Sequence, residues 1–233
     1  MVSPCELVDR DDVPGTSSVM SLMRRGAEYL IWVDGRELMS DRQHGSEDAL
    51  ADLAFDRLAD RPAARVLIGG LGMGFTLAAA LRRLGPEGAV VVAELVPAVV
   101  RWNRGPAGTK AGHPVADPRT GVHAGDVAEL VRAPPAPWDA ILLDVDNGPT
   151  GLTRASNDWL YSAAGLDAAF AALAPGGVLG VWSAAPDAAF TRRLRRAGFG
   201  VEELPVRSRG SRGGHRHVVW IGTRRGPGAR WTR

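Results

Sequence analysis

The chain has 233 residues, of which 45% are hydrophobic and 23% are charged, and its formal net charge is +2. This length suits one domain of ordinary size, or a domain with a small appendage. No apolar run is long enough to span a bilayer, and residues 1–18 lack the charged-then-apolar pattern of a signal peptide, so we expect no membrane association. Cys5 is the only cysteine, which excludes an intrachain disulfide and fits the cytoplasmic location that we expect.

The first 45 residues are predicted to form a small β appendage. Two strand-like runs, 18–23 and 28–33, are separated by a short basic turn, and Asp34-Gly35 is a turn dipeptide. Ser46 then has the hydroxyl of a helix N-cap, and acidic residues follow it in the first turn. The helix is predicted to present Leu50, Leu53, Ala54 and Leu58 on one face and to be closed by Arg61-Pro62.

The next stretch, residues 64–76, is an apolar run that breaks into glycines before a predicted helix over 77–84. A strand, a glycine turn and a helix together offer bare backbone and free N–H groups to a nucleotide-like ligand. The spacing does not fit the dinucleotide pattern G-x-G-x-x-G, and Phe75 occupies the position where a phosphate-binding loop needs lysine. The remaining pattern is G-x-G-x-G at Gly70, Gly72 and Gly74.

Glu94 follows the next apolar run, 89–93, and is therefore expected at the tip of the second strand. An acid in that place can accept hydrogen bonds from both ribose hydroxyls of an adenosine ligand. S-adenosylmethionine (AdoMet), which has no pyrophosphate, fits both this acid and the glycine spacing. The alternative is a glycine turn that only packs a helix on a sheet.

The rest of the chain alternates between strands and helices. We predict helices over 96–104, 127–132, 166–173 and 187–196, strands over 120–123, 138–143, 178–182, 201–206 and 217–223, and a loop over 105–119. The short link between the last two strands requires an antiparallel hairpin. This predicts an α/β fold of the Rossmann-like class I AdoMet-dependent methyltransferase type, mostly parallel with an antiparallel C-terminal pair. The expected parts are a β appendage (1–45), an AdoMet-binding domain (46–223) and a basic tail (224–233).

Acidic residues gather where the predicted strands end, which is where open α/β sheets bind ligands. Asp126, followed by Val127, is placed to accept from the adenine amino group, and Asp144 and Asp146 are expected near the reacting end of the ligand. Such a carboxylate cluster would attract a sulfonium cation or a cationic amine. Taken singly, each acid also fits a solvated loop residue or a helix cap.

These residues resemble the spermidine synthase family of aminopropyltransferases and its bacterial spermidine synthase-like members, over roughly residues 28–223. The resemblance rests on Val66 to Gly74, Glu94, Gly125-Asp126 and Ile141 to Asp144, with Asp34-Gly35 and Asp41-Arg42 before them. It implies the same fold, an adenosine-binding end formed by the glycine loop and Glu94, and a homodimer.

Three positions depart from the family pattern. Met73 stands where the family's G-G-G-D-G loop has its acid, and Asn147 falls at the second aspartate of D-x-x-D, although Asp146 is adjacent. The family's Y-x-E-M stretch, which lines its amine pocket, corresponds to Glu47-Asp48-Ala49-Leu50. The resemblance therefore implies a conserved nucleoside end, including the backbone at Met73, with a different acceptor.

For the chemistry we expect an in-line displacement at a carbon bonded to sulfonium, controlled mainly by positioning. Asp144 is the candidate to orient an amine and receive its proton, with Asp146 and Asn147 as second choices. Trp159 and Tyr161 are candidates to line the acceptor pocket by cation–π contact, or they only pack a loop. His44 is a candidate base, although a lone histidine before a helix is more often structural. No spacing supports a metal site.

Three functions remain open from the sequence. The first is an AdoMet-dependent transfer of a methyl or other alkyl group to a small nucleophile, expected to be an amine. The second is aminopropyl transfer from decarboxylated AdoMet to a polyamine. The third is a non-catalytic or RNA-directed module that uses the 12 arginines found from residue 192 to 233. No aromatic residue alternates with the arginines over 207–216, so we do not expect a nucleic-acid partner.

Overall fold

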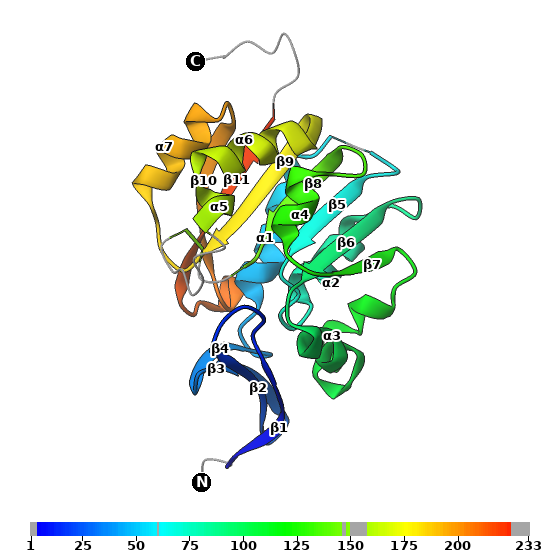
Figure 1. Ribbon diagram of the computed structural model, residues 1–233, viewed down its shortest axis with the longest axis vertical. Coiled ribbons are helices and arrows are strands. Elements are labelled where there is room, and N and C mark those ends of the chain that lie inside the picture. The colour runs from blue at the N-terminus through cyan, green and yellow to red at the C-terminus, as the bar shows by residue number, and fades with distance from the viewer. Residues whose placement is uncertain (1–3, 60, 146–147, 150–157, 225–233) are drawn as a thin grey trace.

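The computed structural model describes residues 4–59, 61–145, 148–149 and 158–224, which form two sheets (Figure 1). The first is a four-stranded antiparallel sheet of β1 (Cys5–Asp12), β2 (Val19–Arg25), β3 (Glu28–Val33) and β4 (Arg36–Ser40). The predicted hairpin is its centre, and Asp34 and Gly35 form the expected turn with φ angles of 49° and 77°. The edge strands β1 and β4 are additional, because their charged, exposed sequences show no clear apolar alternation.

The second sheet has seven strands in the order β10-β11-β9-β8-β5-β6-β7. Its strands are β5 (Arg65–Gly69), β6 (Ala89–Glu94), β7 (Thr120–Ala124), β8 (Trp138–Leu143), β9 (Leu173–Ser183), β10 (Gly200–Arg207) and β11 (Arg216–Thr223). The strands from β5 to β9 are parallel, while β11 is antiparallel to both β9 and β10. The predicted mostly parallel sheet with an antiparallel C-terminal hairpin is thus confirmed.

Helices cover both faces of this sheet (Figure 1). They are α1 (Gly45–Arg57), α2 (Phe75–Arg83), α3 (Pro97–Arg104), α4 (Val127–Arg132), α5 (Asp158–Tyr161), α6 (Ala163–Ala172) and α7 (Ala188–Arg196), with 3₁₀ turns η1 (Pro106–Ala111), η2 (Pro114–Ala116) and η4 (Gly210–Arg212). Alternate residues of each buried strand point to opposite faces. Ile68 therefore packs in the core beneath α1 to α3, whereas Leu67 packs in the core beneath α4 to α7. No described helix is long and apolar enough to cross a membrane.

The start of α1 differs from the prediction. Ser46 is not its N-cap; His44 is, without a side-chain cap bond, and Ser46 is the second residue of the helix. The helix starts early because the Gly45 N–H donates to the Ser208 carbonyl across 2.8 Å, which takes the place of a side-chain cap. The Ser46 hydroxyl is used elsewhere, as described below. The helix also ends at Arg57, before the predicted stop at Arg61-Pro62.

Two further boundaries shift for local reasons. Strand β9 begins at Leu173 and includes the predicted turn 175–177, because its pairing with β8 resumes after an irregularity. Helix α6 begins three residues before the predicted 166, because the Ser162 hydroxyl caps it by accepting from the Gly165 N–H. Neither shift alters the edge of the sheet where the strands β5, β6 and β8 end.

Candidate active site

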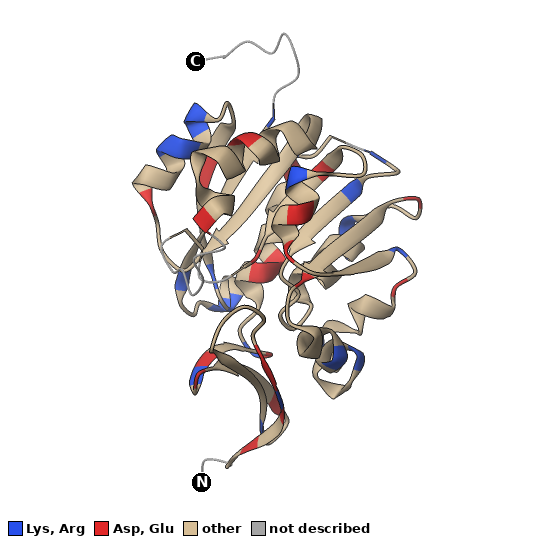
Figure 2. Ribbon diagram, in the orientation of Figure 1, with Lys and Arg blue, Asp and Glu red and all other residues tan. Residues whose placement is uncertain are grey.

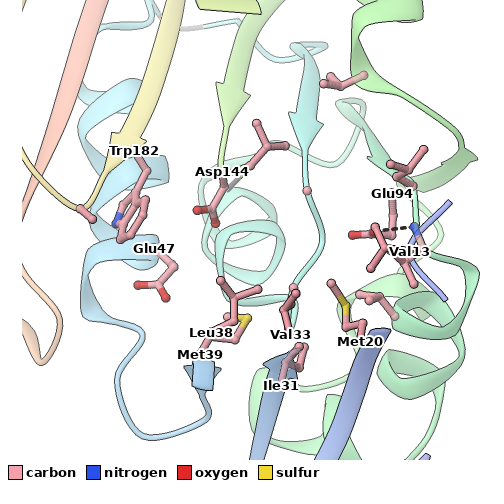
Figure 3. Close-up of a pocket in the computed structure, with 18 of the residues that line it drawn as sticks. Val13, Met20, Ile31, Val33, Leu38, Met39, Glu47, Glu94, Asp144 and Trp182 are labelled. Atoms are coloured by element: carbon pink, nitrogen blue, oxygen red, sulfur yellow. Dashed lines mark hydrogen bonds between the residues drawn. The ribbon is translucent and has the colours of Figure 1, made fainter. Parts of the chain in front are cut away.

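A cavity of about 420 Å³ lies between the four-stranded sheet and the carboxyl ends of the parallel strands (Figure 3). One side is mainly apolar and is formed by the N-terminal sheet. Its apolar residues are Val13, just after β1, and Met20, Ile31, Val33, Leu38 and Met39 in β2 to β4. The opposite side carries the glycine loop, Glu94, Asp126 and Asp144, which are residues that the sequence nominated. The strand order reverses around β5, so this is the usual ligand position of an open α/β sheet.

The glycine loop follows β5 and brings its backbone against the neighbouring segments. A Cβ atom on Gly70 would lie 2.4 Å from the Asp144 carbonyl oxygen, and Gly70 has a φ of +86°. A Cβ atom on Gly72 would lie 2.9 Å from the Met39 sulfur, at a φ of +50°. Position 70 therefore requires glycine, position 72 favours it, and both residues line the cavity. Gly74 begins α2 as its N-cap, without a side-chain cap.

Glu94 fixes this loop from the end of β6. Its Oε2 accepts from the Leu71 N–H at 2.9 Å, and its Oε1 accepts from the Val96 N–H at 2.8 Å. Burial raises the pKa of the Glu94 carboxyl, and these backbone N–H groups oppose the rise. The Leu95 and Gly72 N–H groups act on the same carboxylate. An ionised carboxylate offers about four lone pairs and has no donor, so Glu94 is suited to accept from a hydroxyl in the cavity.

Asp126 and Val127 line the same cavity beyond Glu94. The Asp126 carboxylate caps α4, because its Oδ1 accepts from the Ala128 N–H at 2.8 Å. One carboxylate oxygen is thus used by the helix, and the other is available to an amino group of a ligand.

Asp144 lies directly after β8 and faces the start of α2. Its Oδ2 accepts from the Thr76 hydroxyl at 2.6 Å. Burial raises the pKa of the Asp144 carboxyl to about 6, while the Thr76 hydrogen bond acts in the opposite direction.

Glu47, in the first turn of α1, is the second carboxyl group at this end of the cavity (Figure 3). Its Oε2 accepts from the Ser46 hydroxyl at 2.6 Å. Burial and the nearby charge of Asp144 raise the pKa of the Glu47 carboxyl to about 7. Two carboxyl groups with raised pKa values, on buried Glu47 and half-buried Asp144, mark a candidate catalytic site in this cavity.

The ionisable side chains that line the cavity are mainly acidic. Its lining includes five acids, Glu37, Glu47, Glu94, Asp126 and Asp144, and none of the described lining residues is lysine or arginine. Figure 2 shows the basic residues of α7 at the end of the α/β unit opposite the N-terminal sheet. The cavity therefore favours a cationic ligand. Among the described residues, no group of three or more histidine, cysteine or acidic residues could hold a metal ion.

Five described residues nominated from the sequence lie outside the lining of this cavity: Gly74, Met73, Trp159, Tyr161 and His44. The Met73 side chain is buried in the core at 1% exposure, so its identity does not set the charge of the cavity. The Trp159 ring lies 3.7 Å from the Arg132 guanidinium carbon, and the Tyr161 hydroxyl donates to the Val145 carbonyl at 3.2 Å. His44 stacks on Phe75 and shares a 2.7 Å hydrogen bond with Asp48. These contacts favour the packing alternatives for Trp159, Tyr161 and His44. Asp146 and Asn147 lie outside the described residues.

The lining side chains that were not nominated as site residues include Glu47, Trp182 and His217, although the resemblance matched Glu47 to the stretch that lines the family's amine pocket. Glu47 shares the helical spacing of the buried residues Leu50 and Ala54, and an acid on an apolar face was a usable signal. Among the described residues, Trp182 Nε1 is a buried donor with no hydrogen-bond partner. His217 stands at the start of antiparallel β11, which lies at the edge where parallel β9 ends.

No protein-family model matches the sequence, and no curated protein is significantly similar to it. Solved structures do resemble it. A spermidine synthase from Thermotoga maritima superposes with a TM-score of 0.75 and 17% identity, over 94% of this chain and 73% of that one. A spermidine synthase in complex with the transition-state analogue AdoDATO superposes with a TM-score of 0.74 and 17% identity, over 94% of this chain and 72% of that one. The fold is therefore spermidine synthase-like.

Proposed function

From this spermidine synthase-like fold, we propose that the chain is a transferase that moves an alkyl group from a sulfonium donor of the AdoMet class to a small amine. The observation that carries the proposal is the pair of carboxyl groups of buried Glu47 and half-buried Asp144, both with raised pKa values, in a cavity that also contains the glycine loop. Carboxyl groups in such a place can bind a cationic amine and remove its proton.

The donor end of the cavity suits an adenosine ligand without phosphates. Glu94 offers carboxylate lone pairs for ribose hydroxyls, and Asp126 offers one oxygen to the adenine amino group. The glycine loop lets the ligand approach the backbone, and Phe75 occupies the first turn of α2 where a phosphate would need a cation.

The acceptor end supplies the acid–base chemistry. An ammonium ion has no lone pair, so the amine must lose a proton before or during its attack on the carbon next to sulfur. Asp144 and Glu47 both line this end, and their raised pKa values bring them close to the range where a base works at neutral pH. The Trp182 side chain lies beside Glu47 and offers an aromatic surface to the cation (Figure 3).

A narrower candidate within this proposal is aminopropyl transfer from decarboxylated AdoMet, as opposed to methyl transfer from AdoMet. The carboxylate of AdoMet would meet five acids and no lysine or arginine among the described lining residues, whereas decarboxylated AdoMet carries no carboxylate. This charge balance favours aminopropyl transfer from the decarboxylated donor. One of the similar structures, described as a spermidine synthase with the transition-state analogue AdoDATO, agrees with that candidate.

The test is to incubate the protein with each donor and a panel of small amines, and to identify the nucleoside product by mass spectrometry. S-adenosylhomocysteine would identify methyl transfer, and methylthioadenosine would identify aminopropyl transfer. Calorimetry with both donors measures binding independently of the acceptor. The proposal fails if neither donor binds and neither product forms with any amine.

A further inference from the structure

Among the described residues, a chain of hydrogen bonds leads away from Glu47, one of the two carboxyl groups at the acceptor end of the cavity. The Ser46 hydroxyl donates to Glu47 Oε2 at 2.6 Å, and Ser46 Oγ lies 2.9 Å from His217 Nδ1. Because the hydroxyl proton points to Glu47, Ser46 Oγ accepts from an Nδ1–H of His217 in this arrangement. Ser46 is fully buried, whereas His217 is half-buried and lines the cavity.

The fold holds His217 against Ser46 although 171 positions separate them in sequence. The β10–β11 hairpin docks on the start of α1, where the Gly45 N–H donates to the Ser208 carbonyl at 2.8 Å. A Cβ atom on Gly45 would lie 2.4 Å from the Gly210 nitrogen, so the two segments are in close backbone contact. The Trp182 ring packs against the other side of His217, with centroids 4.8 Å apart.

Within the part of the chain that the structure describes, Asp144 has no comparable connection. Its hydroxyl partner, Thr76, is also 3.5 Å from the backbone carbonyl of Glu47, which cannot carry a proton away. Glu47 instead connects through Ser46 to an imidazole, and beyond that imidazole the exposed His215 also lines the cavity. The two carboxyl groups are therefore unequal in their access to a proton acceptor.

We propose that Ser46 and His217 form a relay that removes the acceptor's proton from Glu47 to solvent. This proposal rests on the transferase function proposed above. It gives the two acids different roles: Asp144 orients the amine, while Glu47 takes the proton and passes it on.

The relay balances without a further reactant. Glu47 receives one proton from the ammonium group of the acceptor. When His217 carries its proton on Nε2, the protonated Glu47 gives a proton to Ser46 Oγ while the Ser46 hydroxyl proton moves to Nδ1. Glu47 is again a carboxylate, Ser46 is unchanged, and the imidazolium releases its Nε2 proton to water. The ring is left with its proton on Nδ1, where it donates to Ser46 as in the arrangement described above. Exchange of that proton to Nε2 through water prepares the ring for the next transfer.

The surrounding groups set the proton affinity at each end of the relay. Glu47 faces Asp144 from the end of β8 and His44 from the residue before α1, while His215 is the titratable neighbour of His217. Burial and the nearby charge of Asp144 raise the pKa of Glu47 to about 7, and burial lowers the pKa of His217 below its usual value of 6.5. Glu47 therefore binds a proton more tightly than His217 does, and release of the imidazolium proton to water completes the transfer.

Two variants test the relay. Ser46→Ala removes the bridging hydroxyl, and His217→Asn keeps a side-chain donor near Ser46 but cannot carry a proton. His113→Asn is the matched control, because His113 lies outside the cavity lining. We expect kcat near pH 7 to fall by about tenfold or more in both variants, with KM changed much less. Added imidazole buffer should restore kcat in the variants and leave the wild type and the control unchanged.

Unchanged kcat and an unchanged pH profile in both variants would overturn the relay. A loss of kcat that imidazole cannot restore would also overturn it, since that result indicates a structural role. Calorimetric donor binding shows that each variant is folded. If the wild-type protein itself binds no donor and forms no product, the transferase proposal fails, and this outcome is distinct from failure of the relay alone.

Discussion

Replacing Glu94 with glutamine should weaken both the fold and donor binding. The two carboxylate oxygens accept from the Leu71 and Val96 N–H groups, at 2.9 and 2.8 Å. Glutamine has one oxygen and one NH₂ group, so one of these buried N–H groups would face another hydrogen-bond donor. A hydrogen bond to a charged group is worth about 1.5–3 kcal/mol, and we expect Glu94→Gln to lower the free energy of unfolding by about that amount.

The same substitution removes one acceptor from the ribose site. The expected loss of donor affinity is again about 1.5–3 kcal/mol, or about 10- to 150-fold in Kd. Urea denaturation measures the first effect without ligand, and calorimetry at a temperature where the variant is folded measures the second. Glu87→Gln, at an exposed site between α2 and β6, is the control for a change of charge alone.

The two measurements separate two roles of this carboxylate. An unchanged denaturation midpoint would show that its bonds to the loop do not stabilise the protein. An unchanged Kd for the donor in a folded variant would refute the assignment of Glu94 to the ribose.

Three other outcomes follow from the geometry. Asp144→Asn should lower kcat far more than it changes donor affinity, and equal kinetics in wild type and variant would reject Asp144 as an acceptor-site residue. Gly45→Ala should destabilise the protein by about 1–3 kcal/mol in denaturant titrations, because its Cβ would lie 2.4 Å from the Gly210 nitrogen; an unchanged midpoint would show that the hairpin yields without cost. The free protein should become less stable as pH rises from about 4.5 to about 7, because the folded state, with pKa values of about 7 for Glu47 and about 6 for Asp144, binds more protons than the unfolded state. Thermal melts should show this slope in the wild type and a smaller slope in Glu47→Gln.

The parallel sheet was predictable because its signals are local. The bounds of β8 and α4 agree with the sequence prediction, since a buried apolar run and a capped amphipathic turn are complete within a few residues. The edge strand β1 was not predictable, because its charged residues bury almost no side chain. Its order comes from pairing with β2, which the sequence of β1 does not encode by itself.

The candidate site divides in the same way. The cavity positions of Glu94, Asp126 and Asp144 follow from the rule that parallel strands end at one edge, so the sequence was sufficient to nominate them. His217 enters the site through the docking of a distant hairpin on α1, which no local pattern reports. Glu47 was open to prediction, because it is an acid on the buried face of α1. Met73 was nominated from its place in the glycine loop, but its side chain is buried in the core. A position within the loop does not determine which way a side chain points.

The cavity also has a consequence for the order of folding. Its lining begins at Val13 in the segment after β1 and ends at His217 in β11, so it is drawn from segments spread over nearly the whole described chain. An N-terminal fragment that stops before β11 can form the glycine loop but lacks His217. The complete cavity must therefore assemble late during synthesis, and a ligand that binds it will stabilise both sheets together.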